Sequence, residues 1–118
     1  MSVVSGVVAL AFAIMGVWAL SAPMMVTRQF GITDLSAQGR SEVRAVYGGF
    51  GLAMAAMLLV FSGSGSVGRG VSLTVAAALG GMAVGRVISL AVDRRIGRMP
   101  SVYLAIEAVA AGTLFFLG

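Results

Sequence analysis

The sequence predicts an all-α integral membrane protein, a four-helix bundle that forms a single domain over residues 1–118. Of these residues, 59% are hydrophobic and 10% are charged, whereas soluble domains carry about 25% charged residues. Apolar runs long enough to cross a hydrocarbon core about 30 Å thick, two of them interrupted by a single charge, alternate with short segments that hold most of the arginines. We therefore expect membrane helices over residues 3–26, 42–61, 71–92 and 100–117.

The first expected helix lies within residues 1–27, which contain no charged side chain. Trp18 lies toward its far end, where tryptophan favours the membrane interface, and Pro23 should kink or end the helix. A cleaved signal peptide is the alternative interpretation. The run lacks the basic first segment and the clear small-residue cleavage site of such peptides, so we interpret it as a membrane helix.

A polar connection over residues 28–40 precedes the second expected helix. Ser41 is a suitable N-cap, because a serine oxygen accepts a hydrogen bond from a free amide of the first turn. Glu42 would then lie favourably near the positive end of the helix dipole. This helix should continue to about Phe61.

The third expected helix follows a flexible turn over residues 62–66, which alternate serine and glycine. A small residue recurs at every fourth position of this helix, which predicts close packing against another helix. A basic turn containing Gly97 leads to the fourth helix, and Pro100 suits its first position. The small residues of the third helix are Ala77, Gly81, Gly85 and Ser89.

The arginines predict the orientation, since short cytoplasmic loops of membrane proteins carry an excess of positive charge. The first and third connections are rich in arginine, whereas the second holds one arginine and the chain ends hold none. We therefore expect the first and third connections to face the cytoplasm and both termini to face the periplasm. The arginines of the first and third connections are Arg28, Arg40, Arg94, Arg95 and Arg98, and that of the second is Arg69.

The composition excludes several classes of chemistry. The chain has no cysteine and no histidine, and all 8 basic residues are arginines. Disulfides, thiolate or imidazole metal sites and Schiff-base chemistry are therefore excluded. The arginines are spread over the loops and form no groove-binding face, so we do not expect nucleic-acid binding. No nucleophile or cofactor motif accompanies the polar residues, so we expect no cofactor, no metal and no enzyme activity.

Two charges lie inside the expected membrane helices. Arg86 lies seven residues before Asp93, and Glu107 lies seven residues after Pro100. At ~1.5 Å per residue, an antiparallel hairpin places both about 10 Å inside and level with each other. An unpaired charge there costs at least ~2.5–3.5 kcal/mol, so we expect the two side chains to interact directly or through one tyrosine or water. Such a pair fits a binding function and a structural salt bridge equally well, and Arg44 is a competing partner for Glu107.

Other polar residues share helix faces with these charges or enter from the same side. Arg44 and Tyr47 lie on one face with Gly48 and Gly51, and the glycines also suit simple close packing. Ser89 and Asp93 follow Arg86 at i+3 and i+7, and Tyr103 precedes Glu107 by four. The candidate binding residues are Arg44, Tyr47, Arg86, Ser89, Asp93, Tyr103 and Glu107.

These residues also carry a resemblance to a known family. The runs Arg-Ala-Val-Tyr-Gly-Gly at residues 44–49 and Gly-Arg-Val-Ile-Ser at residues 85–89, followed by Asp93 and Glu107, resemble a group of small bacterial membrane proteins. That group is catalogued as a domain of unknown function and is similar to the DoxX-like four-helix proteins. The resemblance covers nearly the whole chain. It implies a single four-helix domain in a bacterial inner membrane, with polar residues on helices two to four, and it implies no activity.

Two function hypotheses follow. In the first, the protein is a binding or transport module whose polar pocket, lined by Arg44, Tyr47, Arg86 and Glu107, holds an amphipathic ligand with an anionic or hydroxyl head. In the second, it is a structural or assembly subunit that packs as a homo-oligomer or with a larger membrane-protein partner. The lipid bilayer is the expected surrounding in both hypotheses.

Overall fold

The computed structural model describes residues 2–63 and 65–118, and these residues form helices, turns and irregular connections with no strand among them. This confirms the expected all-α fold. Four helical stretches of the described chain are long and apolar enough to cross a membrane, which makes it a multi-pass membrane protein. They are Val3–Ser21, Ala37–Phe61, Gly65–Asp93 and Arg98–Leu117.

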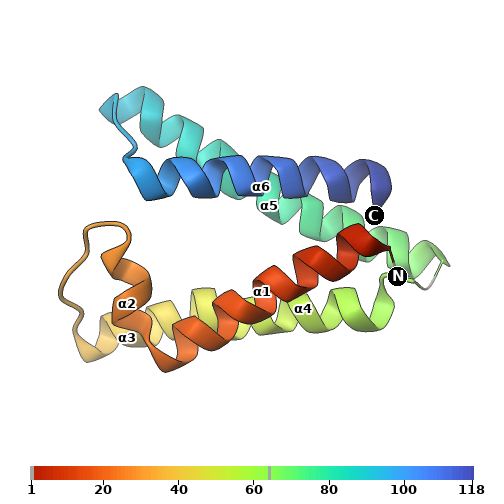
Figure 1. Ribbon diagram of the computed structural model, residues 1–118, viewed down its shortest axis with the longest axis horizontal. Helices are drawn as coiled ribbons and strands as arrows, with labels where there is room; N and C mark the ends of the chain where they lie inside the picture. Colours follow the sequence, from red (N-terminus) through yellow and green to blue (C-terminus); the bar gives the residue numbers. More distant parts are fainter. Residues whose placement is uncertain (1, 64) are drawn as a thin grey trace.

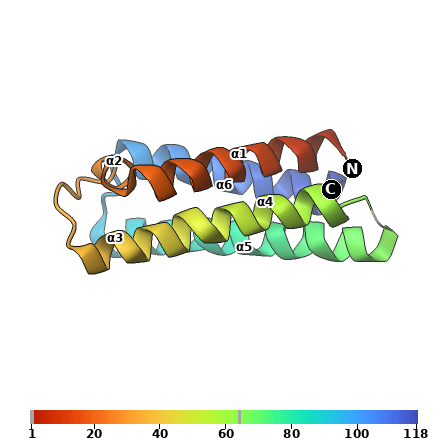
Figure 2. The same cartoon turned by 90° about the horizontal axis from the view of Figure 1, so that it is seen from below.

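The helices pack as two antiparallel pairs, one above the other in Figure 1. One pair is α1 (Val3–Ser21) with α4 (Phe50–Phe61), and the other is α5 (Gly65–Asp93) with α6 (Arg98–Leu117). The pairs meet where α4 contacts α5 and α1 contacts α6 (Figure 2). Both chain termini lie at one end of the bundle, which we call the terminal end (Figure 1). The opposite end, which we call the α2 end, holds α2, α3 and the α5–α6 turn.

The first helix is shorter than residues 3–26 because the chain breaks at Ala22. The backbone of Ala22 has φ −140° and ψ 63°, and Pro23 then begins the separate helix α2 (Pro23–Arg28). Proline has no amide hydrogen to continue the hydrogen-bond pattern of the preceding helix, and its ring suits a first helical position. The expectation that Pro23 kinks or ends the helix is confirmed, and the expected end at residue 26 is corrected to Ser21.

The second membrane helix begins five residues earlier than expected, at Ala37. Ser36 is its N-cap, since the Ser36 hydroxyl accepts a hydrogen bond of 3.0 Å from the amide of Gly39. The predicted cap at Ser41 is therefore wrong. The helix consists of α3 (Ala37–Val43), the π-helical segment η1 (Arg44–Gly49) and α4.

The third and fourth helices also begin before the expected positions, at Gly65 and Arg98 rather than at residues 71 and 100. Gly68 permits the early start of α5, because a Cβ at this position would lie 2.5 Å from the carbonyl oxygen of Ser62. Gly97 precedes α6 with φ +88°, a conformation that glycine adopts without strain. Pro100 lies in the first turn of α6, where the amides have no partner within the helix.

The largest buried apolar cluster joins all four long helices near the terminal end. A smaller cluster at the α2 end packs Ala19, Val26 and Val43 together. Many large apolar side chains on the outside of the bundle are exposed, as Val92 and Phe116 illustrate. Such a continuous apolar surface suits contact with lipid chains rather than water. The residues of the larger cluster are Val8, Ala9, Leu58, Val75, Ala76, Leu79 and Leu114.

Glycines mediate close helix packing, but at other positions than predicted. A Cβ on Gly81 or Gly85 would meet no atom within 4 Å, so the predicted close contact of this small-residue stripe is wrong. The stripe lies on the outer face of α5, because the side of α5 with Val75, Ala76 and Leu79 is the one that faces the core. Close contact occurs instead between α1 and the second membrane helix, where a Cβ on Gly16 would lie 2.9 Å from the carbonyl oxygen of Gly48.

Candidate functional site

A polar cluster joins α5 and α6 toward the α2 end of the bundle. Arg86 on α5 donates a hydrogen bond from Nε to Oε1 of Glu107 on α6, and the two groups form a salt bridge. The predicted interaction of these two residues is confirmed. The Glu107 side chain is 5% exposed and that of Arg86 is 21% exposed, so the cluster opens to its surroundings at the arginine rather than at the carboxylate.

Tyr103, one turn before Glu107, extends this cluster to α2. The guanidinium carbon of Arg86 lies 5.6 Å from the centre of the Tyr103 ring, a distance at which a cation is attracted by an aromatic face. The Tyr103 hydroxyl donates a hydrogen bond of 2.9 Å to Oε1 of Gln29, which directly follows α2. The ring of Phe30 packs against that of Tyr103, with a centroid distance of 5.6 Å.

Several hydrogen-bonding groups of the cluster have no partner. Oε2 of Glu107 is buried and makes no hydrogen bond within the described residues. Within the described residues, the Arg86 side chain makes one hydrogen bond, from Nε. Its two terminal nitrogens therefore have unused hydrogens. The cluster therefore presents an unused acceptor beside unused donors. A buried carboxylate oxygen without a partner is costly, which makes this the strongest candidate for a ligand contact.

Arg44 and Tyr47 lie outside this cluster. The Nε of Arg44 donates a hydrogen bond of 3.1 Å to the carbonyl oxygen of Leu20, in the last turn of α1. Arginine commonly satisfies such free carbonyls at helix ends. Tyr47 packs beside the smaller apolar cluster at the α2 end. Within residues 2–63 and 65–118, Glu107 forms its salt bridge with Arg86 and not with Arg44.

Ser89 and Asp93 follow Arg86 along α5, and both are exposed. Neither makes a hydrogen bond or an ion pair through its side chain in residues 2–63 and 65–118. The structure thus brings Arg86, Tyr103 and Glu107 together and leaves the other four candidates apart from them. The participation of all seven residues in binding stays a prediction.

A family model described as a domain of unknown function, DUF4345, matches residues 1–118 of this chain. The chain belongs to the DUF4345 family. No curated protein and no solved structure matches it. The expectation that the chain belongs to a family catalogued as a domain of unknown function is confirmed.

Two residues of the cluster in this DUF4345 chain, Gln29 and Phe30, were not predicted from the sequence. They belong to the polar connection between the first two membrane helices, and no spacing relates them to Tyr103. Their contact arises because Pro23 restarts the chain as α2, which brings the residues after Arg28 against α6. The one available signal was that a glutamine and an aromatic residue directly follow Arg28 in an otherwise loop-like segment.

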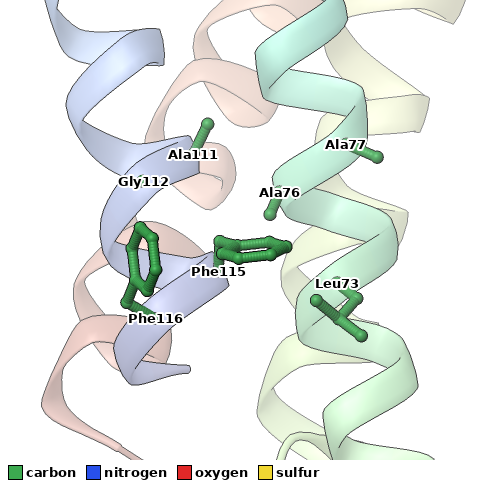
Figure 3. Close-up of a pocket in the computed structure, with 7 residues that line it drawn as sticks. All are labelled: Leu73, Ala76, Ala77, Ala111, Gly112, Phe115 and Phe116. Atoms are coloured by element: carbon green, nitrogen blue, oxygen red, sulfur yellow. The ribbon is translucent and has the colours of Figure 1, made fainter.

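Two surface grooves of this DUF4345 chain lie at the terminal end, away from the polar cluster. One groove of about 520 Å³ lies between α5 and α6 and has almost entirely apolar walls (Figure 3). A second groove lies between α4 and α5 and is lined by residues that include Met54, Gly70 and Thr74. Neither groove is lined by any of the seven predicted binding residues.

Proposed function

We propose that this protein is an intramembrane binding module for an amphipathic small molecule, whose polar head contacts Arg86 and Glu107. The observation that supports this proposal best is the unpartnered Oε2 of the buried Glu107 beside the unused nitrogens of Arg86. A membrane protein gains little from an unsatisfied carboxylate oxygen in its interior. A ligand that supplies a hydrogen-bond donor to this oxygen would remove that cost.

The charges of the cluster indicate which polar head suits it. Glu107 neutralises Arg86, so the pair as a whole offers no net positive charge to an anion. A hydroxyl group can donate to Oε2 of Glu107 and accept from a terminal nitrogen of Arg86 at the same time. A lipid-like alcohol therefore fits the Arg86–Glu107 pair better than a ligand with an anionic head, the other kind of head considered from the sequence. The apolar part of such a ligand would lie along the exposed apolar faces of α5 and α6.

The proposal is tested by purifying the protein in a mild detergent and identifying co-purifying molecules by native mass spectrometry and lipid extraction. We expect one bound amphipathic molecule on the wild type. Glu107→Gln preserves the shape of the side chain and removes the charge, and it should lower occupancy about tenfold or more, because hydrogen bonds to charged groups contribute about 1.5–3 kcal/mol. Tyr47→Phe is the matched control outside the cluster and should keep the ligand. A wild type that carries no such molecule would overturn the proposal.

The location of the protein in a bacterial inner membrane belongs to the same proposal, as does a relation to the DoxX-like proteins. The arginine-rich connections would lie in the cytoplasm, which puts the α2 end and the polar cluster in the cytoplasmic half of the membrane. Binding, rather than catalysis, is the proposed activity, because an unpartnered polar atom accounts for holding a polar head and not for a reaction. Transport would require in addition that the ligand can leave the cluster toward either side of the membrane.

The exposed stripe on α5 favours a second function, that of an assembly subunit. Ala77, Gly81, Gly85 and Ser89 are all exposed, so a second helix could approach this face closely. In-membrane cross-linking discriminates between the two functions. A specific homo-oligomer or hetero-complex that is lost in the double variant Gly81→Leu with Gly85→Leu supports assembly, whereas a monomer with an occupied polar cluster supports binding.

A further inference from the structure

The groove between α5 and α6 at the terminal end has the shape and the walls of a site for a hydrocarbon chain. Small residues form its floor, and the ring of Phe115 extends from α6 toward α5 (Figure 3). Gly112 contributes no side chain, and a Cβ there would meet no atom within 4 Å, so the groove is open at this position. The lining residues are Leu73, Ala76, Ala77, Ala111, Gly112, Phe115 and Phe116.

One positive charge lies at the end of this groove. A terminal nitrogen of Arg69 donates a hydrogen bond of 2.6 Å to the carbonyl oxygen of Phe115, and the Arg69 guanidinium carbon lies 5.8 Å from the Phe115 ring. Arg69 is exposed, and it shares one face of α5 with the lining residues Leu73 and Ala77, at i, i+4 and i+8. The groove therefore runs from a fixed cation at the bundle end toward the middle of the membrane.

This charge is isolated at its end of the molecule. The chain holds no charged residue in its first 27 positions, none between Arg44 and Arg69, and none after Glu107. No acidic side chain forms a salt bridge with Arg69 within the described residues. An anion that approaches the terminal end consequently meets a guanidinium that no acidic side chain neutralises, in contrast to the neutralised Arg86 of the polar cluster.

The geometry points to a binding site for an anionic phospholipid, with its phosphate at Arg69 and one acyl chain in the α5–α6 groove. The apolar walls match an acyl chain and offer nothing to a polar solute. The cation lies where a lipid head group lies when its chain extends inward, and arginine forms strong hydrogen bonds with phosphate oxygens. The site is separate from the Arg86–Glu107 cluster and does not depend on the function proposed for that cluster.

The site is tested with the full chain purified in detergent and titrated with dioleoyl phosphatidylglycerol or dioleoyl phosphatidylcholine, with bound lipids counted by native mass spectrometry. We expect the wild type to prefer the anionic lipid about fivefold, the factor that corresponds to about 1 kcal/mol for one arginine near a membrane surface. Arg69→Gln should abolish this preference. Gly112→Leu should fill the groove and weaken the binding of both lipids.

Gly70→Leu is the matched control, because Gly70 also has free space for a side chain but lines the neighbouring α4–α5 groove. It should leave the lipid preference unchanged. Equal binding of the two lipids by the wild type would overturn the site, as would Gly112→Leu binding as tightly as the wild type. Displacement of the lipid by inorganic phosphate at low millimolar concentration would also overturn the site, because it would show that the acyl chain contributes nothing to binding. Loss of the lipid on formation of a dimer would assign the groove to a second copy of the chain.

Discussion

The hydroxyl of Tyr103 on α6 donates a hydrogen bond of 2.9 Å to Oε1 of Gln29, a residue 74 positions earlier that follows α2. This bond joins the two helix pairs at the α2 end, beyond the large apolar cluster that joins them near the termini. The same tyrosine ring contacts Phe30 and lies beside the guanidinium of Arg86. Tyr103 therefore positions the first connection of the chain over the Arg86–Glu107 pair.

Removing this hydroxyl should weaken the contact between the helix pairs. We expect Tyr103→Phe to lower the free energy of unfolding by about 1 kcal/mol, the typical contribution of one hydrogen bond. Thermal unfolding in detergent, followed by circular dichroism, measures the change. Tyr47→Phe is the control, because the Tyr47 hydroxyl makes no hydrogen bond within the described residues. A double-mutant cycle with Gln29→Ala that shows no coupling would contradict the contact.

The importance of the Arg86–Glu107 pair should be measurable as a change in the yield of folded protein. Arg86→Ala and Glu107→Ala each leave one charge without a partner in the membrane, which typically costs ~3–5 kcal/mol. The double variant removes both charges and should recover much of the yield, measured by size-exclusion chromatography after detergent extraction. Arg94→Ala removes an exposed arginine and is the control.

Two other results would change this interpretation. A double variant whose yield falls by the sum of the single effects would mean that the residues do not act as a pair. If all three variants fold normally and only lose a bound molecule, the charges serve ligand binding and not the stability of the bundle.

Glycine substitutions should have different effects on stability at the packed face of α1 and at the open face of α5. A Cβ on Gly16 would lie 2.8 Å from Cγ of Leu52, so Gly16→Ala should destabilise the protein by about 1–3 kcal/mol through overpacking. Gly81→Ala meets no atom and should cause no loss, since alanine favours helices by about 1 kcal/mol over glycine. Melting temperatures in detergent compare the two. A large loss for Gly81→Ala would indicate that a second molecule covers this face.

The proposed orientation predicts the behaviour of reporter fusions. Alkaline phosphatase fused after Gly118 should be active, because both termini are expected in the periplasm, where its disulfides form. A fluorescent protein that matures only in the cytoplasm should give no signal at the same position. Cytoplasmic fluorescence of the second fusion would overturn the orientation inferred from the arginines.

The presence of the four membrane helices could be predicted because long apolar runs separated by arginine-containing segments have few alternatives to membrane helices. The depth of Arg86 and Glu107 followed from the turn between them, since both positions are counted from the same connection. Helix starts were less predictable. Ser36 and Ser41 are equally good caps by residue type, and the choice between them depends on where the chain arrives after α2.

The remainder of the candidate site depended on contacts between distant parts of the chain. The small residues of α5 could have faced either the bundle or the lipid, because glycine and alanine carry too little apolar surface to decide which face is buried. The sequence allowed Arg44 as a partner for Glu107. In the structure, the break at Ala22 leaves the carbonyl oxygen of Leu20 free, and Arg44 donates to that oxygen instead. The same break explains why Gln29 and Phe30 contact Tyr103, because α2 begins directly after it.

The length of α5 has a consequence for the membrane around the protein. With 29 residues this helix is about 43 Å long at 1.5 Å per residue, whereas the 19 residues of α1 extend about 28 Å. Arg69 and Asp93 lie near its two ends, about 36 Å apart on the same scale. In a hydrocarbon core about 30 Å thick, an upright α5 would leave apolar residues near its ends outside the core, and a tilt of the helix or a local thickening of the bilayer would cover them. In Figure 1, α5 runs at an angle to α6, which is the course that such a tilt would take. A thinner or thicker bilayer would change that tilt and, with it, the angle at which α5 meets α6.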